Sequence, residues 1–138
     1  MIYRDVKPDN LLISTHPRIK LADFGNVHFM SSDDEMIKGM EGTPSYMSPE
    51  MRRGHYYDRK TDIWSLGITL LNVLFDDNTT FPNFEFGGTN AAKRFAEEQE
   101  YLSEAMCDFT LSLFAKADLR PTACELLRVC GIVTMLMM

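Results

Sequence analysis

One stretch of the chain, DIWSLGITLLNVLF at residues 62–75, is apolar on nearly every side when it is drawn as a helix. A helix at a protein surface has one apolar stripe, whereas a helix that is apolar all round must be covered on all sides. We therefore expect a central buried helix with Asp62 as its N-cap. Its apolar side chains are Ile63, Trp64, Leu66, Ile68, Leu70, Leu71, Val73, Leu74 and Phe75.

The size and charge of the chain exclude several classes of protein. Its 138 residues suffice for one domain or part of one, and an apolar content of 45% supports a real core. Residues 1–60 carry nine basic and nine acidic side chains, while residues 61–138 carry five and eleven, so the net charge of −6 lies in the second part. Without a basic face, no nucleic-acid partner is expected. The apolar runs are shorter than the roughly 18 to 20 residues that span a bilayer, so no membrane partner is expected either.

The cysteines and the N-terminus favour an intracellular protein, cytoplasmic or nuclear. Cys107, Cys124 and Cys130 are odd in number and have no metal-ligand spacing, which is typical of reduced thiols. Met1 leads directly into a charged segment rather than into a signal peptide.

The remaining pattern predicts a mainly α-helical fold with a small antiparallel β element. Short β-like runs at 11–14 and 18–24 are joined by a turn that contains a proline, which is typical of a hairpin. A long loop rich in Gly, Ser and Asp follows, and loops of that length are usually functional or disordered. We predict a further loop at 81–88, amphipathic helices at 90–102 and 103–115, and a last helix with Pro121 at its first position.

The segment YRDVKPDN at residues 3–10 places five charged or amide side chains between apolar flanks, and DFG follows with Asp23. Together these segments resemble the catalytic loop, H-R-D-x-K-x-x-N, and the metal-binding motif of eukaryotic protein kinases. The family's order continues with GTPSYMSPE at 42–50, DIWSLG at 62–67 and LRPTACELL at 119–127. The resemblance implies a catalytic loop at 3–10, an activation segment at 23–50 and a helical subdomain at 62–130.

The chemistry of phosphoryl transfer agrees with these residue types. The carboxylate of Asp5 can accept the proton of the attacking hydroxyl, and Lys7 can neutralise phosphoryl oxygens. Asn10 and Asp23 offer the hard oxygen ligands that Mg²⁺ prefers, and two neighbouring β-like runs would bring them together on one ion. ATP and Mg²⁺ are therefore the expected cofactors, and Lys7, Asn10 and Asp23 are expected to bind them. Asp9 is expected to be a solvated turn residue.

The resemblance implies further roles for three residues outside this metal site. Lys7 together with GTPSYMSPE resembles serine/threonine kinases, in which Thr43 bonds to Asp5 and Lys7 and shapes the pocket for a protein substrate. Glu50 is expected to pair with Arg120 in the interior, and Ser48 stands where alanine is usual.

Arg4 has the position of an arginine on which an activation-segment phosphate docks. Residues 34–42 contain no Ser, Thr or Tyr, so Ser31 and Ser32 are the nearest acceptors. They are either a kinase target or part of a solvated loop, and Glu41 could stand in for a phosphate opposite Arg4. Tyr3 replaces the commonest histidine, as in one large active group of these kinases.

The sequence contains no G-x-G-x-x-G loop, so the resemblance covers only the large lobe of an α+β kinase domain, with the N-terminal lobe absent. Three alternatives follow from that. The chain is part of a longer active kinase, or it is a catalytically inactive kinase-like fragment acting as a binding or competitor module, or another chain supplies a small lobe in trans. The missing lead-in helix would also uncover residues 62–75 and favour self-association.

Overall fold

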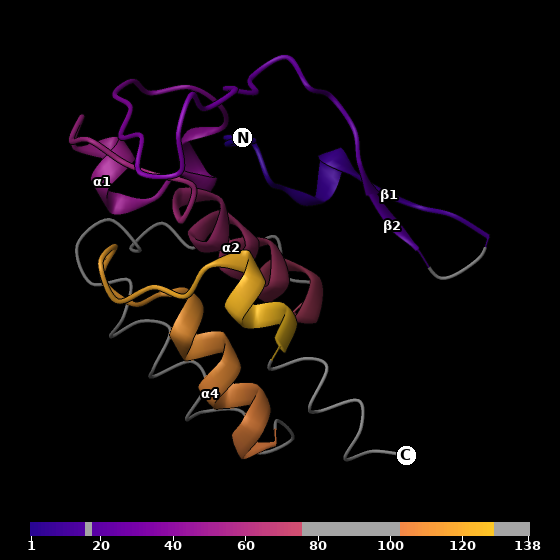
Figure 1. Cartoon of the computed structure of the whole chain (residues 1–138). Coiled ribbons are helices and arrows are strands. Elements are labelled where there is room, and N and C mark those ends of the chain that lie inside the picture. Colours follow the sequence, from indigo (N-terminus) through magenta and orange to yellow (C-terminus); the bar gives the residue numbers. More distant parts are fainter. Residues whose placement is uncertain (16–17, 76–102, 129–138) are drawn as a thin grey trace.

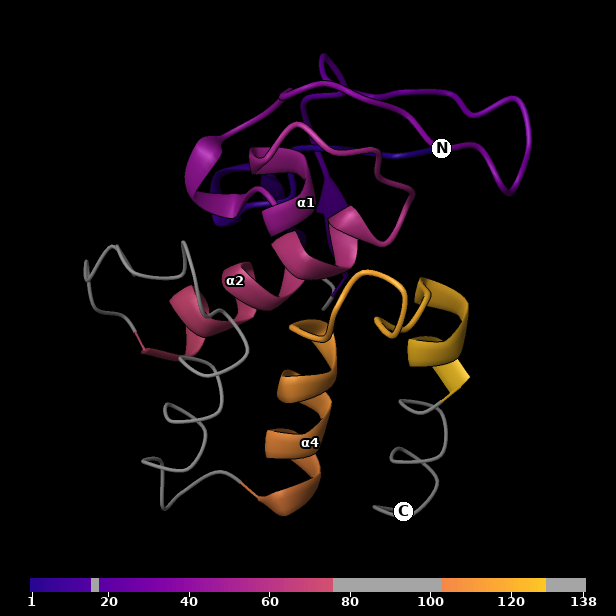
Figure 2. The same cartoon turned by 90° about the vertical axis from the view of Figure 1, so that its left-hand side faces the viewer.

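The computed structural model describes residues 1–15, 18–75 and 103–128. In the described part, α2 lies between the N-terminal segment, with its hairpin and long loop, and α4 (Figure 1). The same order of layers is visible after a quarter turn (Figure 2). The loop and helix predicted for 81–88 and 90–102 lie outside the described residues. The elements, with η for a 3-10 helix, are η1 (Pro8–Asn10), β1 (Leu11–Ile13), β2 (Ile19–Leu21), η2 (Pro44–Tyr46), α1 (Pro49–Arg52), α2 (Thr61–Phe75) and α4 (Glu104–Leu113).

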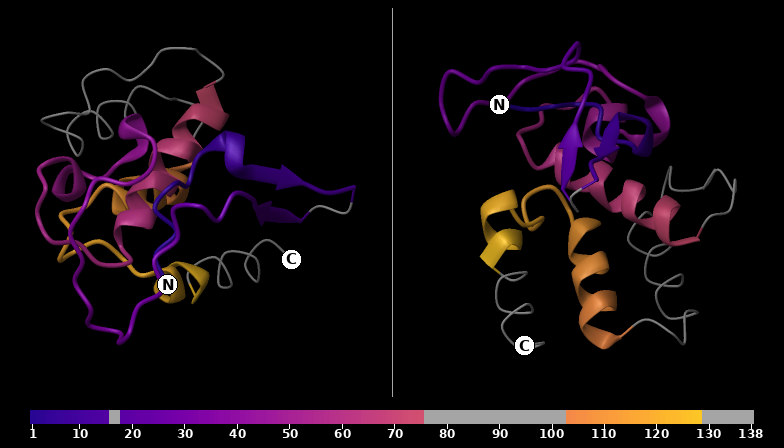
Figure 3. Two further views of the ribbon diagram at one scale, coloured as in Figure 1. Left: turned by 90° about the horizontal axis from the view of Figure 1, so that it is seen from above. Right: turned by 90° about the vertical axis from the view of Figure 1, so that its right-hand side faces the viewer.

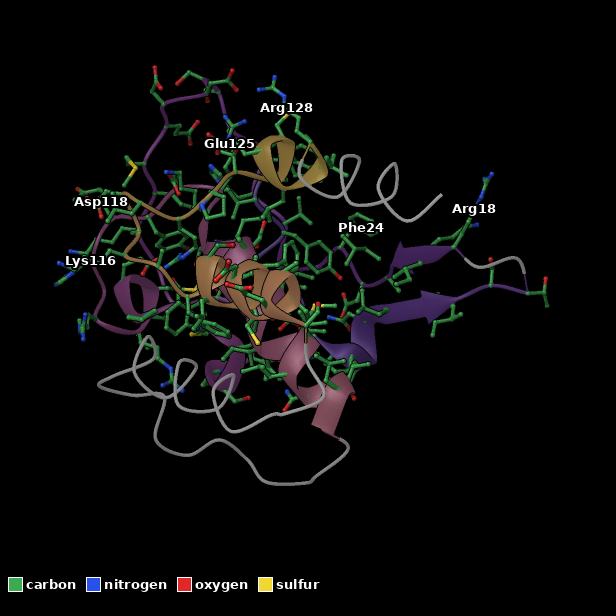
Figure 4. The ribbon with its side chains drawn as sticks, turned by 90° about the horizontal axis from the view of Figure 1, so that it is seen from below. Arg18, Phe24, Lys116, Asp118, Glu125 and Arg128 are labelled. Atoms are coloured by element: carbon green, nitrogen blue, oxygen red, sulfur yellow. The ribbon has the colours of Figure 1, made fainter. Side chains whose placement is uncertain are left out.

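The predicted hairpin is confirmed, with shorter strands than the sequence pattern suggested. β1 and β2 are antiparallel, with Leu12 opposite Lys20 and Ile13 opposite Ile19. The hairpin projects away from the rest of the described chain (Figure 3), and Arg18 points outward from its far end (Figure 4). Ile13 is 81% exposed and Ile19 is 68% exposed, so the hairpin contributes little to the core.

The central helix is confirmed, but the prediction that Asp62 is its N-cap is wrong. α2 begins at Thr61, and Asp62 lies in its first turn. The carboxylate of Asp58 instead accepts the N–H of Lys60 at 2.8 Å, within the turn that leads into the helix. The Asp62 carboxylate is therefore available for partners elsewhere in the chain.

Two sides of α2 form the core, and a third is open. Trp64, Ile68 and Leu71 pack with Phe114, which follows α4. Gly67 permits this packing, since a Cβ at that position would lie 2.8 Å from the Phe114 ring. Three apolar side chains of α2 are exposed, with Val73 at 63%; they are Leu66, Val73 and Leu74. The described residues therefore do not bury α2 on every side, as the sequence had led us to expect.

Two other packing features complete the described fold. Ile63 packs with Leu113 and Leu126, and a separate cluster contains Ile2, Met47, Met51 and Tyr57. None of the helices within residues 1–15, 18–75 and 103–128 has both the length and the hydropathy of a membrane-spanning segment.

The last two predicted helices are present with small shifts at their starts. α4 is capped by Ser103, whose hydroxyl accepts the N–H of Met106. The last helix covers 123–128 of the described part. Pro121 does not occupy its first position as predicted, because Thr122 and Glu125 form a reciprocal capping box that fixes the start two residues later, at residue 123.

Candidate active site

Residues 3–10, the catalytic loop of the sequence prediction, are held by the first turn of α2. The carboxylate of Asp62 accepts the backbone N–H of Tyr3 at 2.7 Å and that of Arg4 at 2.8 Å. Arg4 has a φ of 69°, a left-handed conformation that is costly for a residue with a Cβ. Burial raises the pKa of the Asp62 carboxyl, although both backbone N–H groups favour its charged form. Asp62 thus fixes a strained backbone immediately before Asp5.

Asp5 is buried and lies at the centre of a small polar cluster. Its Oδ1 accepts the backbone N–H of Thr43 at 2.9 Å, and its Oδ2 lies 3.1 Å from Lys7 Nζ. The side-chain amide of Asn10 donates to the Asp5 carbonyl and to Oδ2. Burial works to raise the pKa of Asp5, but hydrogen bonds from Thr43 and Lys7 outweigh it, so the pKa lies below its ordinary value of 3.8.

The chain around Gly42 and Thr43, near the end of the predicted activation segment, passes directly against residues 3–10. Lys7 Nζ donates to Thr43 Oγ1 at 2.7 Å, which closes a triangle of contacts between Asp5, Lys7 and Thr43. This approach depends on Gly42, whose φ is 103°. A Cβ at Gly42 would lie 2.1 Å from the carbonyl oxygen of Arg4, so only glycine fits there.

Tyr3 connects the catalytic loop to the DFG segment. Its hydroxyl donates to the Ala22 carbonyl, and its ring meets Phe24 edge-on with centroids 5.7 Å apart. Burial raises the pKa of Tyr3, and the charges of Asp23 and Asp5 raise it further.

Asn10 and Asp23 lie beside the hairpin rather than on its strands, contrary to the prediction. Asn10 ends η1, because Pro8 starts a tight turn ahead of β1. Asp23 follows β2 by two residues, with a φ of 57°, and its Oδ1 accepts the N–H of Gly25 at 3.1 Å. The N–H of Ala22 donates to the Asn10 carbonyl at 2.9 Å, which keeps the two segments adjacent.

Glu50 and Arg120, which lie seventy positions apart, form a bidentate ion pair. Arg120 Nη1 lies 2.7 Å from Glu50 Oε1, and Nη2 lies 3.3 Å from Oε2. Arg120 is 1% exposed, also donates to the Lys60 carbonyl, and lies over the Trp64 ring. Burial works to raise the pKa of Glu50, but Arg120 outweighs it and lowers the pKa below its ordinary value.

The comparison with known proteins decides the family. A family profile described as "Protein kinase domain" matches residues 1–130. The chain belongs to the protein kinase family. Similar proteins include the serine/threonine-protein kinase Nek2 of Mus musculus, 34% identical over 130 residues, which are 92% of this chain and 29% of Nek2. The serine/threonine-protein kinase ULK3 of Xenopus laevis is 36% identical over 127 residues, 90% of this chain and 24% of ULK3. The chain thus spans less than a third of the length of these curated relatives.

The donor set of this kinase chain fits the metal that the family uses. Kinases of this family generally bind ATP with Mg²⁺. Mg²⁺ prefers hard oxygen ligands and keeps several waters, so one carboxylate and one amide oxygen are a suitable protein contribution. Asp23 would supply the carboxylate and Asn10 the amide. The described part of the chain contains no group of three or more His, Cys, Asp or Glu side chains that could hold a metal ion.

The arginine that precedes Asp5 has a different partner from the predicted one. Its Nε donates to the Asn26 carbonyl, at the start of the activation segment. The predicted contact with Glu41 is absent from the described hydrogen bonds and ion pairs of Arg4. The side chain of Arg4 therefore holds the chain at Asn26 through a backbone carbonyl rather than through a carboxylate or phosphate.

Sequence reasoning missed two residues that support this kinase site. The hydroxyl of Tyr46 accepts from Asn72 at 3.0 Å, and its carbonyl accepts from Ser65 at 2.8 Å, so α2 holds η2 in place. Ser48, noted only as a departure from alanine, shares a 2.7 Å hydrogen bond with the buried Thr61. None of these three contacts has a signal in the sequence, because each joins residues more than ten positions apart.

Proposed function

We propose that the chain is the large-lobe part of a serine/threonine kinase domain, with its catalytic loop at 3–10, activation segment at 23–50 and helical subdomain at 62–130. In this proposal it transfers the γ-phosphoryl group of ATP to Ser or Thr hydroxyls of a protein substrate. One observation carries the proposal, namely the triangle of contacts between Asp5, Lys7 and Thr43. It unites the catalytic loop with the end of the activation segment, as the reaction requires.

Asp5 is the proton acceptor in this reaction. Its lowered pKa keeps the carboxylate ionised near neutral pH, which is the form that can take a proton from the substrate hydroxyl. The hydroxyl oxygen then forms its bond to phosphorus while the bond to the leaving ADP oxygen breaks. A positioned base of this kind typically contributes about 10² to 10⁴-fold to the rate.

The negative charge of the phosphates would be neutralised by one lysine and by a metal held by two further residues, namely Lys7, and Asn10 with Asp23. Lys7 places its ammonium beside Asp5, where the migrating phosphoryl oxygens would be. Asn10 and Asp23 would hold the Mg²⁺ of ATP, and that ion neutralises charge on the phosphates. The hydrogen bond from Asn10 to Asp5 fixes the amide beside the base before any ligand binds.

Several properties of the whole protein remain proposals. Relatives named as serine/threonine kinases support Ser or Thr as the acceptor, with Thr43 shaping that pocket. The acidic second part of the chain supports a protein substrate over nucleic acid or membrane. We place the protein in the cytoplasm or nucleus, consistent with three cysteines outside any metal or disulfide pattern.

The α- and β-phosphates need groups that these 138 residues do not encode, since the sequence contains no G-x-G-x-x-G loop. We propose that a small lobe supplies them, either in a longer form of this protein or from another chain in trans. The apolar side chains of the hairpin, with Ile13 81% exposed, offer a surface for such a lobe.

The second candidate function is a catalytically inactive fragment that acts as a binding or competitor module. The same exposed apolar side chains favour it, because such a surface serves a binding partner as well as a small lobe. In this case the site geometry would persist without turnover.

A fusion with a small lobe distinguishes the two candidates. The chain is joined to the N-terminal lobe of an active serine/threonine kinase, and phosphate transfer to mixed Ser, Thr and Tyr peptides is measured with Mg²⁺ and labelled ATP. We expect label on Ser or Thr, and loss of at least about 10²-fold in Asp5→Asn, which keeps the shape but removes the base. Asp9→Asn is the matched control, because Asp9 lies in the same loop and makes no contact with the triangle.

Nucleotide binding by the fusion provides the second measurement. Asp23→Ala should abolish the Mg²⁺-dependent part of ATP affinity, while the Mg²⁺-independent part persists. A folded fusion that binds Mg²⁺ and ATP without turnover would support the inactive candidate. Turnover that survives Asp5→Asn within tenfold would contradict the assignment of the base.

A further inference from the structure

Three buried hydroxyl groups interrupt the apolar surface of α2, each about one turn from the next. Thr61, Ser65 and Thr69 follow one another at intervals of four residues, which places them on one face of the helix. All three residues are at most 4% exposed. A buried hydroxyl group without a hydrogen bond is costly, so each of these groups needs a partner.

Two of the hydroxyl groups contact the end of the predicted activation segment. Thr61 Oγ1 lies 2.7 Å from the hydroxyl oxygen of Ser48, which caps α1. Ser65 Oγ donates to the carbonyl of Tyr46 in η2 at 2.8 Å. The first two positions of this face therefore hold the segment that contains η2 and the start of α1.

The third hydroxyl group contacts the loop that contains Asp5. Thr69 Oγ1 lies 3.2 Å from the Val6 carbonyl oxygen and 2.8 Å from the Ser65 carbonyl oxygen of its own helix, so its single proton is shared between two acceptors. The Ser65 carbonyl lies inside α2, where the helix backbone supplies a donor as well. Among the described residues, Thr69 supplies the donor to the Val6 carbonyl. Loss of the hydroxyl would therefore affect the loop more than the helix.

Asp5 thus lies between two contacts with the same helix. Asp62 accepts the backbone N–H of Arg4 just before Asp5, and Thr69 donates to the carbonyl of Val6 just after it. The two helix residues are seven positions apart, which is about 10 Å along the axis of α2. One helix therefore fixes both ends of the short segment that carries the Asp5 carboxylate.

We propose that Thr69 is a positioning residue for phosphoryl transfer, which holds the Val6–Lys7 peptide so that the Lys7 ammonium stays in contact with Asp5 and Thr43. A peptide unit is planar, so a fixed Val6 carbonyl also fixes the direction in which the chain continues into Lys7. Lys7 Nζ lies 3.1 Å from Asp5 Oδ2 and 2.7 Å from Thr43 Oγ1. A displacement of about 1 Å in a reacting site can lower the rate by about 10²-fold. This inference rests on the proposed kinase function.

Thr110 in α4 provides a matched control. It is 1% exposed, and its hydroxyl donates to the carbonyl of Met106, four residues earlier in its own helix, at 2.8 Å. Thr69 makes the same contact with Ser65 at the same distance. Thr110→Val therefore removes the same group from a similar helix position, without removing a described contact with the loop of Asp5.

Steady-state kinetics of the fusion with a small lobe test the positioning role. Thr69→Val keeps the shape of the side chain and removes the hydroxyl. We expect kcat to fall by about tenfold or more while the KM for ATP changes by less than about twofold, since Lys7 acts on the transition state. Thr69→Ser keeps the hydroxyl and should have a kcat within about threefold of the wild type, and Thr110→Val within about twofold. The urea midpoints of the two valine variants should agree.

A measurement on the 138-residue chain tests the contact without ATP or substrate. Val6–Lys7 is the one Val–Lys pair in the sequence, so ¹³C at the valine carbonyls and ¹⁵N in lysine together select a single peptide resonance. Loss of the hydrogen bond in Thr69→Val should move the Val6 carbonyl resonance upfield. Thr69→Ser and Thr110→Val should leave this resonance where the wild-type chain has it.

The two measurements fail in different ways. An unchanged Val6 resonance in Thr69→Val would overturn the contact. Equal kcat values for the two valine variants, or a Thr69→Ser variant as slow as Thr69→Val, would overturn the positioning role. A wild-type fusion without turnover would instead contradict the proposed function, and the Val6 resonance would still decide whether Thr69 holds this peptide.

Discussion

Asp62 Oδ1 lies 2.8 Å from the backbone nitrogen of Arg4, which is fifty-eight positions earlier in the chain and has a left-handed backbone. The same carboxylate holds the N–H of Tyr3 at 2.7 Å. These two contacts set the path of the chain into Asp5. A residue of the central helix therefore determines the geometry of the catalytic loop. Removing the Asp62 carboxylate should lower the stability of the chain and also disturb the site around Asp5.

Asp62→Ala should destabilise the chain by about 2 to 5 kcal/mol, because it leaves two part-buried backbone N–H groups without an acceptor. The free energy of unfolding in urea measures this. Asp58→Ala, which removes the turn contact to Lys60 ahead of the same helix, is the matched control and should cost about 1 kcal/mol. An equal loss of unfolding free energy in the two variants would show that the contacts of Asp62 with Tyr3 and Arg4 stabilise the chain no more than an ordinary turn contact does.

Gly42→Ala should cost about 3 kcal/mol or more, since the new Cβ would overlap the Arg4 carbonyl and the backbone has a positive φ. Gly54→Ala provides a matched comparison. Gly54 also has a positive φ of 66°, but nothing lies within 4 Å of the added Cβ. Its cost should be about 1 to 2 kcal/mol. If thermal unfolding ranks the two variants the other way, the close approach of Gly42 to Arg4 is not a feature of the folded chain.

Arg120→Ala should destabilise the chain by about 3 to 5 kcal/mol, because Glu50 would keep a charge in the interior without its partner. Arg128→Ala, on the exposed last helix, controls for the loss of a positive charge and should change the free energy of unfolding by about 0.5 kcal/mol or less. A cost below about 1 kcal/mol for Arg120→Ala would mean that solvent screens the pair.

The same ion pair predicts how stability depends on pH. The folded-state pKa of Glu50 is below its ordinary value of 4.5, so the unfolded chain takes up the proton first as the pH falls. The stability that Glu50 contributes is therefore complete above pH 4.5 and is lost as the pH falls below it. Glu50→Gln should flatten this part of a stability curve measured between pH 6 and 3. Glu104→Gln, at an exposed position in α4, should leave the slope as it is in the wild-type chain.

The purified chain should self-associate through the exposed apolar side chains of the hairpin. Sedimentation should show species heavier than a monomer. The double variant Ile13→Lys with Ile19→Glu should shift the distribution toward the monomer, since it places an opposite-charge pair at directly opposed positions. Arg18→Ala, at the outer end of the same hairpin, should not shift it. An unchanged distribution in the double variant would locate the association elsewhere, with the exposed face around Val73 as the next candidate.

Local sequence patterns were enough to predict several elements correctly. The hairpin follows from two β-like runs around a turn, α2 from its apolar pattern, and α4 from Ser103 and the helical period after it. The order of five short motifs was enough to indicate the kinase family, because each motif is a contiguous run of residues. The pairing of Glu50 with Arg120 came from the resemblance alone, since nothing in the spacing of those residues indicates that they meet.

Tertiary structure alone decided which groups each of these residues contacts. Asp62 was predicted to cap its own helix, yet it serves the backbone of Tyr3 and Arg4, because the helix begins one residue earlier and leaves the carboxylate free. The contact of Glu35 with His28 and the approach of Gly42 to Arg4 likewise depend on the path of the loop between them. Periodicity and capping are properties of neighbouring residues, so a sequence displays them directly. Contacts between distant segments depend on how those segments pack, and only the folded chain contains that information.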